Sequence, residues 1–191
     1  DVLDAVRKQG YRAMSALLDQ YPEAVVFILP GNLRHWAVDA YYQLGLIEAM
    51  AERDAPGGLH FGSEWTYYVR DRLATMGCTR FEDTAVEGLT SPKVTAYWKR
   101  RCSVAPGVWP LHMSETDRND VPVRPWKEEV AEIREQMRVL RSTAKFYMWS
   151  FTITPYYYVH TPELEQKYKL PKQMQKYADV DVRDWHRILL D

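Results

Sequence analysis

Glu64 is the residue whose type and surroundings best suit catalysis. It ends the strand expected over Leu59–Glu64 and is followed by Trp65 and Tyr67. Aromatic rings around a carboxyl group disfavour its charged form and raise its pKa, which is the environment of a general acid. The structural alternative is an ion pair with a nearby cation such as Arg70. The pattern predicts Glu64 as a catalytic acid or nucleophile.

A glycosidase needs a second carboxylate about 5 to 9.5 Å from the first. Glu115 and Asp117 are candidates, because they lie in the polar stretch Ser114–Asn119. The alternative is a solvated loop with no chemical role, since connecting loops are usually polar. His112 alternates with apolar neighbours, so it either packs in the core or contacts a ligand. We predict Glu115 and Asp117 as catalytic residues and His112 as a substrate-binding residue.

Aromatic side chains gather at the ends of two expected strands. Such rings stack on the apolar faces of sugars, but they also fill ordinary protein cores. The predicted substrate-binding aromatics are Trp65, Tyr67, Trp149 and Tyr156, the last of which opens a run of three tyrosines.

Motifs for other chemistries are missing from the sequence. There is no H-E-x-x-H pattern and no Cys/His cluster, so we expect no metal. There is no nucleophile elbow, dinucleotide-binding glycine pattern or P-loop, and we expect no cofactor. His60 lies early in its expected strand and is interpreted as structural.

The bulk composition is that of a globular protein without a large charge field. The chain has 191 residues, of which 46% are hydrophobic, and its formal net charge is -1. A balanced charge gives nucleic acid no electrostatic footprint, and no apolar run is long enough to span a membrane. We therefore expect residues 1–191 to form one soluble α/β domain, cytoplasmic or secreted after processing. We also expect it to be a processed chain, a fragment or a subunit of a larger barrel or assembly.

Alternating apolar patterns predict repeated strand–helix units. Short apolar runs bounded by breakers predict strands, and apolar positions three and four apart predict helices. Ser91 followed by Pro92 is typical of a helix start. The expected strands cover residues 24–29, 59–64, 107–113 and 146–153. The expected helices cover residues 2–20, 34–53, 69–77 and 91–101, a stretch through 130–140, and one near 181–190.

This alternation is typical of parallel strands joined by helices. Two architectures fit it: about half of a (β/α)8 TIM barrel, or an open parallel sheet with flanking helices. A barrel needs eight strands, so the barrel interpretation requires strands from elsewhere. In either case the loops after the strands share one rim, and that rim is where active sites lie.

Two parts of the chain resemble glycoside-hydrolase-like TIM-barrel proteins. The first is the helix end Gly45–Met50 followed by Leu59–Tyr67, and the second is Glu132–Met137 followed by Lys145–Ser150. The likeness covers residues 10–155, in the order of a barrel's C-terminal half. It implies that Glu64 is an active-site carboxylate and that the strand of Trp149 lines the pocket. The aromatic strand departs from the family pattern, because it runs into Thr152–Thr154 where an acid is common.

Three functions remain open on these observations. The first is a glycoside hydrolase, or a fragment or subunit of one, that cleaves a glycosidic bond with Glu64. The second is a non-catalytic carbohydrate-binding or assembly subunit on the same scaffold. The third is an open-sheet α/β enzyme that uses His112 or Asp117. Because half a barrel would expose a wide sheet edge, we also expect a homodimer or a complementing chain.

Overall fold

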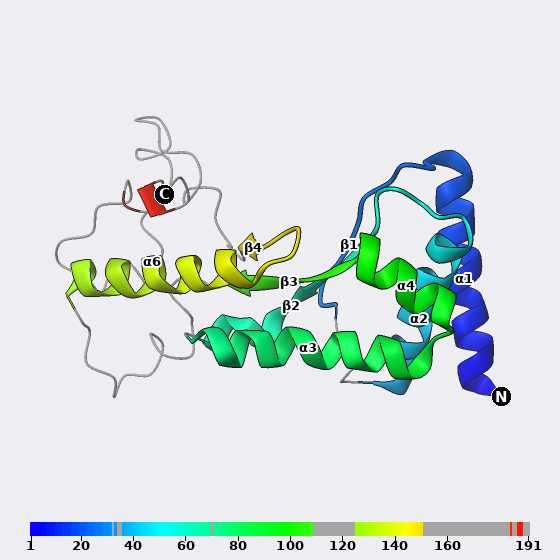
Figure 1. The fold of residues 1–191 in the computed structure, drawn as a ribbon, viewed down its shortest axis with the longest axis horizontal. Helices are drawn as coiled ribbons and strands as arrows, with labels where there is room; N and C mark the ends of the chain where they lie inside the picture. The colour runs from blue at the N-terminus through cyan, green and yellow to red at the C-terminus, as the bar shows by residue number, and fades with distance from the viewer. Residues whose placement is uncertain are drawn as a thin grey trace, which may run out of the picture.

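A computed structural model describes residues 1–31, 33, 36–69, 71–108, 125–150, 184 and 187–188 of the chain (Figure 1). Helices and strands alternate along most of these residues. Its elements are α1 (Val2–Gln20), β1 (Val26–Ile28), α2 (Ala37–Glu52), β2 (Leu59–Ser63), the 3-10 helix η1 (Glu64–Tyr68), α3 (Arg72–Leu89), α4 (Pro92–Arg101), β3 (Ser103–Val108), α6 (Trp126–Thr143) and β4 (Trp149–Ser150). None of the described helices combines the length and apolar character needed to cross a membrane.

The strands form an open, parallel sheet in the order β1-β2-β3-β4. The first three strands have three, five and six residues, and β4 adds two more at the edge. This confirms the expected α/β class with parallel strands and flanking helices. Closure into a barrel is not seen in the described residues. Right-handed crossovers between sequential parallel strands place the connecting helices on one face of the sheet.

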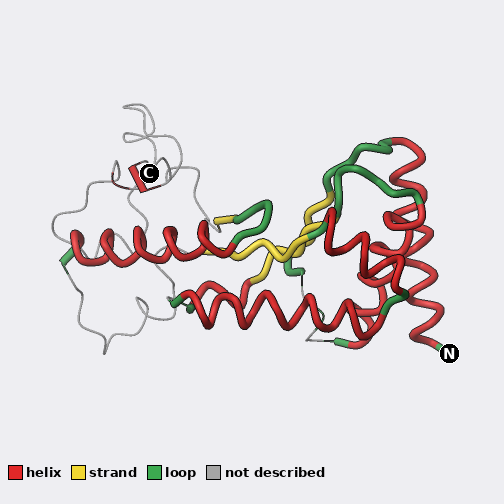
Figure 2. Tube along the Cα trace, viewed as in Figure 1, coloured by secondary structure: helices red, strands yellow, loops and turns green. Residues whose placement is uncertain are grey.

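One face of the sheet packs on the helices and holds the main core. Leu59 and Phe61 of β2 are fully buried there, and Val104 of β3 joins the same cluster. The ring of Phe61 lies 5.1 Å from that of Trp98 in α4. Figure 2 shows α1, α2 and α4 gathered at one end of the molecule, with α3 running from them toward α6. The helices therefore cover the face that the apolar strand residues predict.

The other face of the sheet carries half-exposed aromatic and aliphatic side chains. His60 alternates with Phe61 along β2, so it points to this face. Its ring lies 4.5 Å from the ring of Tyr147 and 6.4 Å from that of Phe27. Phe27 is 38% exposed, Leu29 55% and Tyr147 42%. Monomeric soluble proteins seldom leave neighbouring apolar side chains such as these exposed together on one face.

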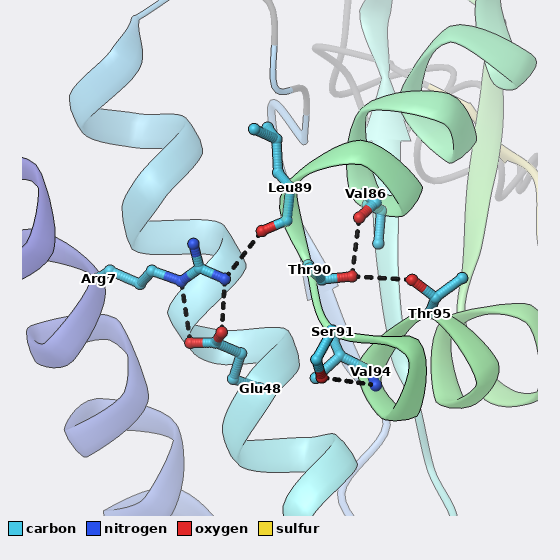
Figure 3. Close-up of polar contacts among 8 residues, drawn as sticks. All are labelled: Arg7, Glu48, Val86, Leu89, Thr90, Ser91, Val94 and Thr95. Atoms are coloured by element: carbon cyan, nitrogen blue, oxygen red, sulfur yellow. Dashed lines mark hydrogen bonds and ion pairs between the residues drawn. The ribbon is translucent and has the colours of Figure 1, made fainter.

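Two glycines let α1 and α2 cross closely. A Cβ atom at Gly10 would collide with the carbonyl oxygen of Tyr42, and one at Gly45 would collide with that of Arg7. The Arg7 guanidinium donates to both carboxylate oxygens of Glu48, at 2.5 and 3.0 Å, and to the carbonyl oxygen of Leu89 at 3.0 Å (Figure 3). The same arginine therefore ties the helix pair to the end of α3.

The predicted bounds of one helix and one strand were wrong. The helix expected over 69–77 is α3 and runs to Leu89. Its buried positions include Thr75 and Glu82, so a polar stripe concealed the helical period. The strand expected over 107–113 begins at Ser103, because Ser103 pairs with His60 of β2. Residues 109–124 lie outside the described residues.

Other expectations agree with the structure. The Ser91 side chain caps α4 by accepting from the backbone N–H of Val94, and Pro92 is the first helical residue, as predicted. The strand expected over 146–153 appears as β4 at Trp149–Ser150, and its later part lies outside the described residues. The helix expected near 181–190 is described at only three residues.

We expect Gly45→Ala to lower the free energy of unfolding by about 2 kcal/mol or more, because the added methyl group meets backbone that has to shift. Urea denaturation measures the loss. Gly88→Ala in α3 is the matched control, because a Cβ there meets nothing within 4 Å. That variant should instead gain roughly 0.5 to 1 kcal/mol from helix propensity. Equal stability of the two variants would contradict the close crossing.

Candidate functional site

Glu64 and Trp65 lie at the carboxyl end of β2, on the first turn of η1. Both side chains are exposed, Trp65 by 39%. The carboxyl ends of parallel strands share one edge of a sheet, and ligand sites of α/β folds lie there. The position of Glu64 agrees with the prediction. Glu64 is exposed, so the apolar surroundings expected from Trp65 and Tyr67 do not enclose it.

The hydroxyl group of Thr66 fixes η1 to the neighbouring strand. Thr66 is fully buried, and its Oγ1 accepts from the backbone N–H of Gly107 in β3 at 2.6 Å. The carbonyl oxygens of Gly107 and Ser63 lie 2.9 and 3.1 Å from the same hydroxyl, which donates its one proton between them. Because buried polar groups are costly when unpaired, these bonds hold η1 in one conformation.

Gln136 of α6 holds the other side of η1. Its Nε2 group lies 3.1 Å from the carbonyl oxygen of Tyr67, 3.3 Å from that of Val69 and 3.4 Å from that of Thr66. Gln136 is 5% exposed. Sequence reasoning missed both Gln136 and Thr66. One signal was present, since Gln136 lies three residues after Ile133 on the apolar stripe of α6, where a buried amide needs partners.

Two of the predicted aromatics pack against each other. The rings of Tyr67 and Trp149 are 5.2 Å apart and inclined by 58°, and Tyr67 is 6% exposed. Gly107 lies beneath them, and a Cβ there would come within 2.8 Å of both rings. The structure therefore joins the ends of β2, β3 and β4 through this pair. Trp65, at the end of β2, is more exposed than Tyr67, at 39% of its surface.

The other predicted site residues belong to parts of the chain that the structure does not describe. His112, Glu115, Asp117 and Tyr156 all lie outside the described residues, as does Arg70, the alternative partner of Glu64. Among the residues that are described, no group of three or more His, Cys, Asp or Glu side chains could hold a metal ion.

His60 and Ser103 form a buried polar pair near the amino ends of β2 and β3. His60 Nδ1 lies 2.9 Å from the Ser103 hydroxyl, and Nε2 lies 3.2 Å from the carbonyl oxygen of Gly57. Since a carbonyl only accepts, Nε2 carries the proton and Nδ1 accepts from Ser103. Burial lowers the pKa of His60, and the nearby charge of Lys145 lowers it further against the opposing effect of Gly57. The pair is structural, as predicted for His60.

We expect the protein to lose stability as the pH falls below about 6.5, the ordinary pKa of histidine. The folded pKa of His60 lies below the unfolded one, so the unfolded chain binds the extra proton first and stability is complete only above that pH. Urea denaturation between pH 5 and 8 measures this slope. A His60→Gln variant, which keeps one donor and one acceptor, should show a shallower slope. Identical slopes would mean that His60 titrates normally in the folded protein.

No family model, curated protein or solved structure matches this chain. The resemblance of residues 10–155 to glycoside-hydrolase-like barrels therefore stays a prediction. The described residue among the predicted catalytic carboxylates, Glu64, lies at the end of β2. There, Glu64 and Trp65 are consecutive exposed residues on a turn that buried hydrogen bonds hold.

Proposed function

We propose that the carboxyl end of β2 binds a carbohydrate and that Glu64 takes part in cleaving a glycosidic bond. One observation carries this proposal: Glu64 and Trp65 are exposed neighbours on a turn that Thr66 and Gln136 hold from below. Binding sites gain from side chains that are held in place before the ligand arrives, because less entropy is lost on binding.

The chemistry of the two side chains suits a sugar. An indole ring offers a flat apolar face to the C–H groups of a pyranose. A carboxyl group at the same end of the strand can protonate a leaving oxygen or attack the anomeric carbon. Cleavage needs a second carboxylate, for which Glu115 and Asp117 remain the candidates.

The proposed scaffold is one part of a (β/α)8 barrel. Two features of the sheet support it: the strand order is sequential and parallel throughout, and the face opposite the helices exposes Phe27, Leu29 and Tyr147. In a barrel that face becomes the packed interior. Two copies of the chain together supply eight parallel strands, and we propose that a second copy covers this face.

A non-catalytic carbohydrate-binding subunit is the second candidate function. Its support is the exposed indole ring of Trp65 at the carboxyl end of β2. Trp65 alone is enough for binding, whereas hydrolysis requires the paired acid. The two candidates differ in turnover and share the same binding surface.

Screening the chain against an oligosaccharide array identifies a ligand, and calorimetry then measures its affinity. We expect Trp65→Ala to weaken binding by about tenfold or more, as loss of one stacking contact predicts. Tyr21→Ala, which removes an exposed ring before β1, should leave the affinity unchanged. If no oligosaccharide binds, or if both variants bind equally, the carbohydrate site is wrong.

We expect Glu64→Gln to bind the same sugar and to lower hydrolysis by roughly 100-fold or more, as loss of an acid–base group predicts. Release of reducing sugar measures the rate. Binding without turnover in the unaltered chain would favour the non-catalytic subunit. Full hydrolysis by Glu64→Gln would remove Glu64 from the mechanism.

We expect the purified chain to have a native mass of at least twice 22.4 kDa, because a second copy covers the open sheet face. Light scattering after gel filtration measures it. Leu29→Asp places a charge on that face and should shift the mass toward one chain. Val2→Asp, at an exposed site on α1, is the matched control. A monomer of the unaltered chain would contradict the barrel completed by a second copy.

A further inference from the structure

A polar groove lies between α3 and α6, in the helix layer and apart from the Glu64 turn. Its volume is about 480 Å³. Arginines, hydroxyl-bearing residues and two apolar side chains line most of it. The lining residues are Arg72, Leu73, Met76, Gly77, Thr79, Arg80, Asp83, Ser142 and Thr143.

The two arginines of the groove differ from the paired arginines elsewhere in the chain. Arg7, Arg53 and Arg138 each form an ion pair with a carboxylate. Within the described structure, the side chains of Arg72 and Arg80 have no ion pair or hydrogen bond, and both are exposed. Guanidinium groups bind carboxylates in a bidentate fashion, so two open ones in a groove favour an acidic ligand.

Gly77 lines the groove without a side chain. A Cβ atom at Gly77 would meet nothing within 4 Å, so neither close packing nor backbone conformation requires glycine there. A glycine within a helix costs roughly 0.5 to 1 kcal/mol relative to alanine. Leu73 is 79% exposed and Met76 is 42% exposed, and both lie between the two arginines in sequence. The groove therefore offers an apolar surface between two positive charges.

The hydroxyl groups of the groove already use their protons. Thr79 donates to the carbonyl oxygen of Met76, Ser142 to that of Val139, and Thr143 to those of Val139 and Leu140. Their oxygens are left to accept hydrogen bonds from N–H groups. Asp83 accepts from the Trp98 indole N–H and lies near the charge of Lys145, so its own charge is partly compensated.

We propose that this groove binds an extended acidic peptide segment of a partner protein. Arg72 and Arg80 are eight residues apart on one helix, which separates their Cα atoms by about 12 Å along the axis. Four residue steps of extended peptide cover about 13 Å. Two acidic residues four positions apart thus match the two arginines, and an apolar residue between them meets Leu73 and Met76. Backbone N–H groups of the peptide donate to the free hydroxyl oxygens.

The test uses a fluorescein-labelled peptide containing Glu-Ala-Leu-Ala-Glu, with a Gln-Ala-Leu-Ala-Gln peptide as the comparison, in fluorescence anisotropy titrations of the full chain. We expect the acidic peptide to bind and its affinity to fall with added salt, because both contacts are charge-assisted. The Gln peptide should bind about tenfold or more weakly. Equal binding of the two peptides, or no binding of the acidic one, would overturn the proposal.

Matched variants separate the groove from general surface charge. The double variant Arg72→Gln/Arg80→Gln should lose about tenfold or more in affinity for the acidic peptide. Arg12→Gln/Arg101→Gln removes the same charge from exposed positions on α1 and α4, and it should bind as the unaltered chain does. If both double variants lose affinity equally, binding is a nonspecific charge effect and the groove is not the site.

A second pair of variants tests the groove at Gly77 and does not depend on charge. Gly77→Leu should block the peptide, whereas Gly88→Leu, on the same helix and equally free of neighbours, should not. Thermal unfolding checks that both variants stay folded. Inorganic phosphate and citrate serve as competitors. If either displaces the peptide at micromolar concentration, the groove binds small anions and the peptide proposal fails.

Discussion

The return path between parallel strands is the constraint on which the rest of this structure depends. Neighbouring parallel strands cannot be joined by a tight turn, so the chain has to travel back along the sheet before each new strand. Here α2 makes that return before β2, α3 and α4 together make it before β3, and α6 makes it before β4. As a result, all the strands end at one edge, and η1 begins at that edge.

Buried hydrogen bonds hold η1 in place at this edge of the sheet. Thr66 connects η1 to β3, and Gln136 reaches the same turn from α6. The Thr66 hydroxyl and the Gln136 amide nitrogen both have hydrogen-bond partners here, so breaking the arrangement would leave these groups unpaired away from water. That cost keeps Glu64 and Trp65 on a rigid turn even though both face solvent. A catalytic or binding role benefits from such rigidity, because a displaced carboxylate loses most of its effect.

Several charged side chains of this chain form ion pairs that differ in burial. The ion pair of Arg7 with Glu48 is about three-quarters buried, and it links α1 and α2 beside their glycine crossing. The pairs of Arg53 with Asp19 and of Arg138 with Glu135 are more exposed and contribute little to stability. Arg72 and Arg80 of α3 differ from these, since they line the groove between α3 and α6 and form no ion pair within the described residues.

The sequence by itself determined the α/β class, the parallel alternation and the place of Glu64 at a strand end. Apolar runs, chain breakers and the Ser91 cap depend on residues that are close together in the chain. They can therefore be recognised from the local sequence. Tertiary structure alone decided the length of α3, the start of β3 and the exposure of Glu64. Those features depend on partners far away in the chain, as in the pairing of His60 with Ser103 and of Gln136 with η1. A contact between residues forty or seventy positions apart produces no periodic pattern in the sequence. Whether such a residue is buried depends on the distant helix or strand that packs against it.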